Sequence, residues 1–120
     1  MNKVLVLEDS IAEQQLLNVM IAKCGFEADF YNNVSEVLDN PSILSNASLI
    51  ICDCDLVDSN TLPVLKYMKD NNINTPVVLN SGNYGFDTIV KEHGYGDLVV
   101  DDWGKNHSLS RIRSVLNSYK

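Results

Sequence analysis

The chain has 120 residues, and nine Lys and Arg against sixteen Asp and Glu give it a formal net charge of −7. This length fits one domain, and a hydrophobic fraction of 45% is ordinary for a protein with a buried core. The acidic balance argues against direct binding of nucleic acid, which needs clustered Lys and Arg, and the apolar runs are too short to cross a membrane. Because the N-terminal residues also lack the pattern of a signal peptide, we expect a cytoplasmic protein.

Apolar runs and segments of helical spacing alternate along the chain. In chain order we predict strand Lys3–Leu7, a helix from Ser10 to Gly25, strand Glu27–Tyr31, a short helix opened by Asn33 or Ser35, strand Ser48–Cys52, a helix with Pro63 in its first turn, strand Thr75–Leu79, a helix from Phe86 to Gly94, strand Asp97–Val100 and a last helix capped by Ser108. Glu27–Tyr31 alternates like an edge strand, whereas Ser48–Cys52 is apolar enough to be central. The alternation predicts an α/β fold in one domain, residues 1–120: a doubly wound, five-stranded parallel sheet with helices on both faces.

Polar residues follow the predicted strands at the point where each strand ends. Seven of the sixteen acidic residues lie there, with one amide and one hydroxyl: Glu8, Asp9, Asp53, Asp55, Asp58, Asp101, Asp102, Asn80 and Ser81. In doubly wound sheets the carboxyl ends of the strands form the edge where ligands bind. We therefore predict a functional site made of carboxylates at this edge.

Carboxylates gathered in this way repel one another, and a divalent cation that prefers oxygen ligands, such as Mg²⁺, relieves the repulsion. A carboxylate outside the coordination of the metal can then act as a nucleophile toward a phosphoryl group. The Ser81 hydroxyl and the Gly82 amide are placed to donate hydrogen bonds to a phosphoryl oxygen. The residue types thus predict phosphoryl chemistry that depends on a metal ion.

Four segments, in this order and spacing, resemble the receiver domain of two-component response regulators: Val4–Asp9, Leu49–Asp53, Pro76–Gly82 and Gly94–Val100. The resemblance covers essentially the whole chain and implies the flavodoxin-like form of the fold. It also implies a signalling role, with no enzymatic activity beyond the phosphorylation and dephosphorylation of the domain itself.

The same resemblance implies roles for individual residues. Asp53 corresponds to the aspartate that accepts a phosphoryl group from a histidine kinase or a histidine phosphotransfer protein. Glu8 and Asp9 correspond to the acidic pair for Mg²⁺, which Asp53 and the Asp55 backbone carbonyl would also ligate. Ser81 corresponds to the hydroxyl residue that contacts the phosphoryl group. Output would pass to a partner protein or domain through the surface of the family's fourth helix, fifth strand and fifth helix.

Three positions depart from the family pattern. Asp101 stands where the family has a lysine that reaches the phosphorylation site, while Leu98 replaces the usual aromatic switch residue and Val57 replaces a frequent proline. The predicted site then combines four acidic residues: Glu8, Asp9, Asp53 and Asp101. Lys105, four residues beyond Asp101, would have to reach back to supply the missing charge, and a solvated lysine is the alternative.

Other interpretations remain open. The reversed charge at Asp101 is compatible with a degenerate receiver that acts as a docking module without being phosphorylated. The segment Asp53–Ser59 also resembles the nucleophile motif of haloacid-dehalogenase-type phosphatases, although it lacks their Gly-Thr pair and only 67 residues (120 − 53) follow Asp53. A flavodoxin-like small-molecule binder is a third alternative, but no glycine-rich phosphate loop follows the first strand.

The remaining reactive side chains fit structural roles. The cysteines lack the spacing of a metal site, so we expect them to be buried and reduced: Cys24, Cys52 and Cys54. Trp103 is predicted to pack in the core. His93 and His107 have no partner spacing that would indicate a metal ligand or a catalytic base.

Overall fold

The computed structural model describes residues 2–54, 56, 60–82, 85–104 and 106–119. In these ranges five strands form one parallel sheet in the order β2-β1-β3-β4-β5: β1 (Lys3–Leu7), β2 (Glu27–Tyr31), β3 (Leu49–Cys52), β4 (Val77–Leu79) and β5 (Val99–Asp102). This confirms the predicted doubly wound sheet, with β2 at an edge and the apolar β3 in the centre. The chain passes from β1 outward to β2 and then crosses to β3, so the topological switch point lies between β1 and β3.

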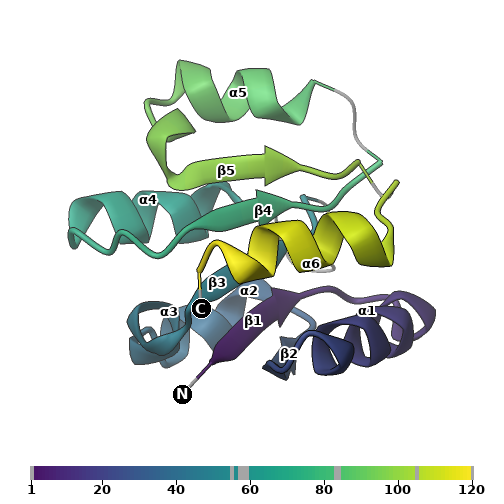
Figure 1. The fold of residues 1–120 in the computed structure, drawn as a ribbon. Coiled ribbons are helices and arrows are strands. Elements are labelled where there is room, and N and C mark those ends of the chain that lie inside the picture. Colours follow the sequence, from purple (N-terminus) through teal and green to yellow (C-terminus); the bar gives the residue numbers. More distant parts are fainter. Residues whose placement is uncertain (1, 55, 57–59, 83–84, 105, 120) are drawn as a thin grey trace.

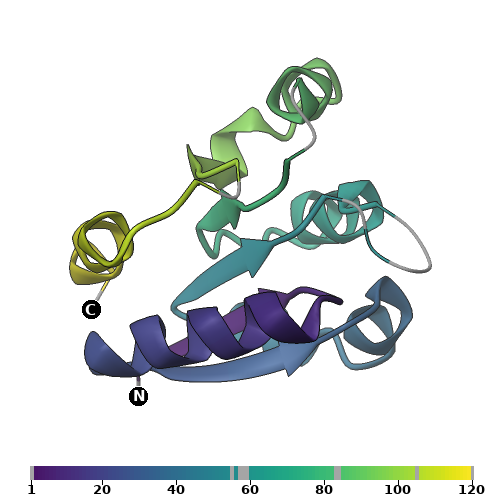
Figure 2. The same ribbon diagram turned by 90° about the vertical axis from the view of Figure 1, so that its right-hand side faces the viewer.

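Six α-helices of the described ranges cover the two faces of the sheet: α1 (Ile11–Lys23), α2 (Val34–Asp39), α3 (Ser42–Asn46), α4 (Leu62–Asp70), α5 (Phe86–Glu92) and α6 (Leu109–Asn117). Helices α1 and α6 lie on one face, and α2, α3, α4 and α5 lie on the other (Figures 1 and 2). None of these helices is long and apolar enough to span a membrane.

Polar residues set the starts of several helices at the predicted places. The side chains of Ser10, Asn33 and Ser108 each accept a hydrogen bond from the backbone N–H three residues later, which satisfies one of the unpaired donors of a first turn. Pro63 lies in the first turn of α4, where its missing N–H costs no hydrogen bond.

The core has two halves, one on each face of the sheet, because neighbouring residues of a strand point to opposite sides. In β1, Val4 and Val6 pack with α1 and α6, whereas Leu5 and Leu7 pack under the other four helices. Trp103, just after β5, is buried in the first half, which confirms its predicted packing role. Each fully buried aliphatic side chain contributes roughly 1.5–3 kcal/mol, so the two halves together hold the strand ends in place.

The last strand begins two residues later than its sequence pattern predicts. The predicted range is Asp97–Val100, whereas β5 spans Val99–Asp102. Gly94 takes a left-handed conformation (φ 83°), and the Leu98 N–H then donates to the Tyr95 carbonyl in a 3-10 turn. The chain therefore becomes extended only after this turn.

A β-bulge shifts the register of β5 against β4. Val78 pairs with Asp101, and the skipped residue, Val100, is 44% exposed. Asp101 and Asp102 consequently lie within the strand and not beyond its end, and as consecutive residues they point to opposite faces of the sheet.

Candidate functional site

Three carboxylates meet at the carboxyl edge of the sheet. Glu8 and Asp9 follow β1, and Asp53 follows β3, with its N–H donating to the Leu7 carbonyl (2.8 Å). One oxygen of each carboxylate lies within 4.8 Å of the other two. Glu8 and Asp53 are only 1% and 7% exposed, and Asp9 is the most exposed of the three. The predicted convergence of these side chains is confirmed, and it places oxygen donors of the kind that Mg²⁺ prefers at the switch point.

Glu8 is held in place by the start of α1. Its carboxylate accepts a hydrogen bond from the Ser10 N–H (3.1 Å), and its backbone carbonyl accepts one from Gln14 Nε2 (2.5 Å). The side chain is thus oriented by the protein itself. Preorganisation of this kind lowers the entropic cost of binding a ligand.

Ser81 lies close to Asp53 at the same edge. The Asn80 N–H donates to the Cys52 carbonyl (2.8 Å), so β3 and β4 stay paired up to the residues that precede Asp53 and Ser81. Ser81 is buried, and its side chain hydrogen-bonds the thiol of Cys54, the residue after Asp53. The fourth strand therefore delivers a hydroxyl group to the same edge as the carboxylates.

The structure places Asp101 apart from the three carboxylates. Trp103 Nε1 donates to its Oδ2 (2.8 Å), and Arg111 donates to its Oδ1 (3.2 Å) and Oδ2 (3.4 Å). Among the described residues, the acidic side chains close enough to share a metal ion do not include Asp101. This corrects the expectation of a four-carboxylate site. The bulge in β5 turns Asp101 toward the face of α6, where Arg111 supplies a cationic partner.

Comparisons with known proteins place this geometry in a family context, although no family model matches the chain. The cell cycle transcriptional regulator CtrA of Caulobacter vibrioides is 30% identical over 120 residues, a match that covers 98% of this chain and 52% of the relative. The receiver domain of a putative LuxO repressor protein from Vibrio parahaemolyticus has a TM-score of 0.83 at 21% identity, over 98% of this chain and 88% of that one. The receiver domain of the sensor histidine kinase PA1611 from Pseudomonas aeruginosa, which has a magnesium ion in its active site cleft, has a TM-score of 0.77 at 14% identity, over 98% of this chain and 96% of that one.

The chain has the fold of response-regulator receiver domains, and its similarity to CtrA supports this interpretation, so we call it the receiver domain. CtrA is a transcriptional regulator, and the two solved structures are receiver domains of other proteins. The predicted flavodoxin-like fold is confirmed, and these matches favour the receiver interpretation over the phosphatase and the small-molecule binder. The receiver domain spans about half the length of the curated relatives that it matches.

Thr61 supports Asp53 from within the receiver domain, and no sequence pattern indicated it. Its hydroxyl donates to the Asp53 carbonyl oxygen (2.7 Å), and it is completely buried. The contact joins residues eight positions apart, a separation that neither the strand nor the helix period predicts.

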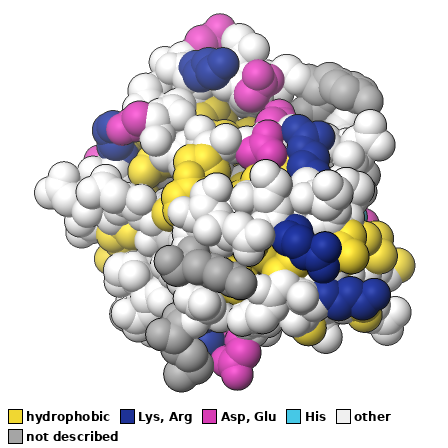
Figure 3. Space-filling model, in the orientation of Figure 1, with side chains coloured by type: hydrophobic (Ala, Val, Ile, Leu, Met, Phe, Trp, Pro, Cys, Tyr) yellow, Lys and Arg dark blue, Asp and Glu magenta, His cyan; other side chains and the backbone are white. Residues whose placement is uncertain are grey.

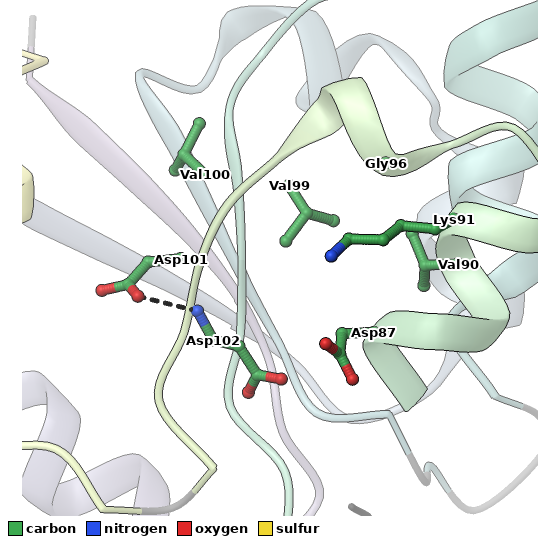
Figure 4. A pocket seen from close by; sticks show the side chains of 8 residues that line it. All are labelled: Asp87, Val90, Lys91, Gly96, Val99, Val100, Asp101 and Asp102. Atoms are coloured by element: carbon green, nitrogen blue, oxygen red, sulfur yellow. Dashed lines mark hydrogen bonds between the residues drawn. The ribbon is translucent and has the colours of Figure 1, made fainter. Parts of the chain in front are cut away.

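Asp102 lies on the opposite side of β5 from Asp101. Its carboxylate points toward Asp87 of α5, whereas that of Asp101 points away (Figure 4). Desolvation raises the pKa of Asp102, and the charge of Asp87 adds to the rise, while a hydrogen bond from the Gly104 N–H opposes it. Asp87 and Asp102 line a groove of about 170 Å³ between α5 and β5, with Lys91 above it (Figure 4).

The cysteines are buried and form no disulfide, as predicted. Burial raises the pKa of the Cys52 thiol to about 12, and it also raises the pKa of the Cys54 thiol, with the neighbouring Asp53 charge acting in the same direction. Cys54, although adjacent to Asp53, is therefore a protonated thiol and not a nucleophile.

His107, for which the sequence indicated no partner, bonds Glu13. Its side chain is 3% exposed, and its Nε2 lies 2.6 Å from Glu13 Oε1. The spacing Ser10-x-x-Glu13, which puts a carboxylate in the first turn of a helix, was an available signal for Glu13. No signal could reveal a partner 94 residues away.

Several residues of the sequence analysis lie outside the described part of the receiver domain: Asp55, Val57, Asp58 and Lys105. The metal-ligand role of the Asp55 carbonyl and the placement of Lys105 stay predictions.

Proposed function

We propose that the receiver domain accepts a phosphoryl group on Asp53 from a histidine kinase or a histidine phosphotransfer protein. The observation that carries the proposal is the convergence of Glu8, Asp9 and Asp53, whose carboxylate oxygens lie within 4.8 Å of one another. Three such groups, two of them buried, repel one another unless a cation is present. The donor set fits Mg²⁺, the ion that the PA1611 receiver domain holds in its cleft.

In this proposal Glu8 and Asp9 hold Mg²⁺, together with one oxygen of Asp53 and the backbone carbonyl of Asp55. The bound ion supplies charge neutralisation to the incoming phosphoryl oxygens. The second oxygen of Asp53 attacks phosphorus, so that an O–P bond forms and the P–N bond to the donor histidine breaks. The electron pair of that bond returns to the imidazole nitrogen, which takes up a proton. The Ser81 hydroxyl donates a hydrogen bond to a phosphoryl oxygen and orients the group.

We further propose that output passes to a partner protein or domain through the surface of α5, β5 and α6, the family's fourth helix, fifth strand and fifth helix. Ile89 and Val100 are 39% and 44% exposed on these elements, and Val100 also lines the groove between α5 and β5. The side that carries α6 mixes basic, acidic and apolar side chains (Figure 3). This mixture suits a protein partner in the cytoplasm and not nucleic acid, which needs a surface of positive charge.

Phosphorylation-independent docking is the second candidate function. It rests on Asp101, which stands at the family's lysine position and is bonded to Trp103 and Arg111. Asp101 supplies no positive charge to a phosphorylated Asp53. A receiver domain without that charge would keep the fold and the partner surface while losing the phosphoryl switch.

Incubation with Mg²⁺ and acetyl phosphate, followed by intact-mass spectrometry, distinguishes these functions. Phosphorylation of Asp53 predicts the gain of one phosphoryl group by the wild type and by Asp39→Asn, a matched control on the exposed side of α2, and none by Asp53→Asn. No gain by the wild type, either with acetyl phosphate or with a phosphorylated histidine kinase, would leave the docking function. Repeated turnover of a phosphate ester would contradict both.

A further inference from the structure

Three polar side chains from three separate elements form a partly buried cluster next to the carboxylate site. Glu13 lies in the first turn of α1, Asn80 follows β4, and His107 precedes α6. His107 Nε2 lies 2.6 Å from Glu13 Oε1, and Asn80 Nδ2 donates to the same oxygen at 3.1 Å. Because a carboxylate oxygen only accepts hydrogen bonds, His107 Nε2 must carry the proton. We call these three residues the Glu13 clamp.

Glu8, and not Glu13, accepts the hydrogen bond from the N–H of the helix-capping residue Ser10. In a capping box, the third residue of a helix returns its carboxylate to the N–H of the capping residue. Here the Ser10 N–H donates to Glu8 Oε1 instead (3.1 Å), while the Glu13 N–H donates to the Ser10 hydroxyl (3.3 Å). The Glu13 carboxylate can therefore extend toward Asn80 and His107.

The clamp touches the site at one end and Trp103 at the other. Asn80 directly precedes Ser81, and its N–H donates to the Cys52 carbonyl just before Asp53. At the other end, the His107 ring meets the indole of Trp103 edge-on, with ring centroids 5.9 Å apart. Trp103 is 1% exposed and packs against Ile112 and Leu116 of α6 in one half of the core. The three residues thus connect the strand ends of the site with α6.

The arrangement leaves two buried polar atoms unpaired. In the part of the chain that the structure describes, Asn80 Oδ1 and His107 Nδ1 have no hydrogen-bond partner. Buried polar groups are normally paired, because an unpaired one is costly. A cluster with unpaired atoms can therefore gain stability if it rearranges and forms new hydrogen bonds when its surroundings change. A phosphoryl group drawn toward Ser81 would change the surroundings of Asn80, the next residue.

We propose that Glu13 is a positioning residue that relays occupancy of the Asp53 site through Asn80 and His107 to Trp103 and α6. The inference rests on the proposed phosphorylation of Asp53 and adds the route by which the signal leaves the site. Leu98 stands where the family has an aromatic switch residue, and it is buried without a polar atom to take part in a hydrogen-bonded relay. The Glu13 clamp supplies a hydrogen-bonded path that this position lacks.

The test uses Mg²⁺ with beryllium fluoride, a mimic of a phosphoryl group that binds carboxylates. Fluorine NMR reports whether the mimic is bound, and the indole N–H signal of Trp103 reports the relay, since the chain has one tryptophan. We expect bound-fluoride signals and a shifted indole signal in the wild type. Glu13→Gln and His107→Phe should keep the fluoride signals and lose more than half of the indole shift. Glu36→Gln, on the exposed side of α2, makes the same charge change as Glu13→Gln and should behave as the wild type.

The possible failures are separable. If the wild type binds fluoride without an indole shift, or if Glu13→Gln binds it and keeps the full shift, the relay is wrong and the proposed function stands. If Glu13→Gln loses the fluoride signals while Glu36→Gln keeps them, Glu13 assembles the site and does not relay its state. If the wild type binds no fluoride, the proposed Asp53 site fails and the relay fails with it. Glu13→Gln preserves the shape of the side chain. If His107→Phe does not fold, the measurement on Glu13→Gln alone decides whether the relay exists.

Discussion

Thr61 donates its hydroxyl hydrogen to the backbone carbonyl oxygen of Asp53 across 2.7 Å, and both residues are buried. The bond joins the start of α4 to the end of β3. It holds the main chain from which the Asp53 carboxylate projects, and it uses only the backbone oxygen of that residue. The proposed phosphoacceptor is thus anchored by a residue that takes no part in the chemistry.

Thr61→Val should destabilise the receiver domain through this bond. The substitution keeps the shape of the side chain but removes the donor, so the Asp53 carbonyl stays buried with one hydrogen bond fewer. We expect the free energy of unfolding, measured by urea denaturation, to fall by about 1–3 kcal/mol. Thr88→Val makes the same change on the exposed side of α5 and should stay within about 0.5 kcal/mol of the wild type. Equal losses in both variants would show that the buried bond contributes nothing.

Magnesium should stabilise the fold through the three carboxylates. A ligand that binds only the folded state at about 100 times its Kd raises the free energy of unfolding by roughly 2.7 kcal/mol, which a thermal melt detects. Asp9→Asn removes the negative charge of one carboxylate. It should lower the affinity for Mg²⁺, measured by calorimetric titration, at least about tenfold, or roughly 1.4 kcal/mol. Without Mg²⁺ the same variant should melt above the wild type, because a repulsive charge is gone.

A matched control for the metal site is Asp39→Asn, which removes a carboxylate from exposed α2. It should leave both the Mg²⁺ affinity and the melting temperature near those of the wild type. Loss of Mg²⁺ affinity by Asp39→Asn to the same extent as by Asp9→Asn would indicate diffuse attraction to the acidic surface and not a site.

Asp101→Lys restores the family's lysine in the sequence, but we expect it to harm the fold and not to improve phosphorylation. It would place an ammonium group beside the Arg111 guanidinium and remove the acceptor of the buried Trp103 indole N–H. The free energy of unfolding should fall by about 1–3 kcal/mol in urea denaturation. Asp39→Lys, with the same charge change at an exposed position, is the control. A faster rate of phosphorylation by acetyl phosphate in Asp101→Lys would show that this side chain can turn into the site.

The fold could be predicted from the sequence because its main signals are local. The apolar runs of β1 and β3 mark buried strands, and the caps at Ser10, Asn33 and Ser108 mark helix starts. The three carboxylates could be predicted to meet because they follow strands that are neighbours in a parallel sheet. The start of β5 was predicted wrongly because a 3-10 turn and a strand can share the same short apolar sequence.

The surroundings of the site could not be predicted because they depend on tertiary contacts. A bulge within β5, which leaves no trace in the periodicity, decides that Asp101 faces Arg111 and not the other carboxylates. Glu13 and His107 meet across 94 positions of sequence, and each alone looks like an ordinary polar residue of a helix or loop. Sequence reasoning thus finds residues whose position follows from the strands, and it misses those that hold them in place.

Alkaline pH should weaken the fold through Cys52. In the unfolded chain its thiol has the ordinary pKa of 9.0, whereas burial raises the pKa in the folded state to about 12. Between these values the unfolded state has lost a proton that the folded state keeps. The contribution of this thiol is therefore fully present below the unfolded pKa, and it falls as pH rises, with a limiting slope on the order of 1 kcal/mol per pH unit. Cys54, whose pKa is also raised by burial, acts in the same direction.

Urea denaturation at several pH values between about 8 and 11 measures this slope. Tyrosines and lysines titrate in the same range, so the informative quantity is the difference between the wild type and Cys52→Ala. The variant loses packing and should be less stable at every pH, but its stability should decline less steeply, because one of the two thiols with a raised pKa is gone. Parallel curves for the two proteins would show that Cys52 does not remain protonated in the folded state while it ionises in the unfolded one.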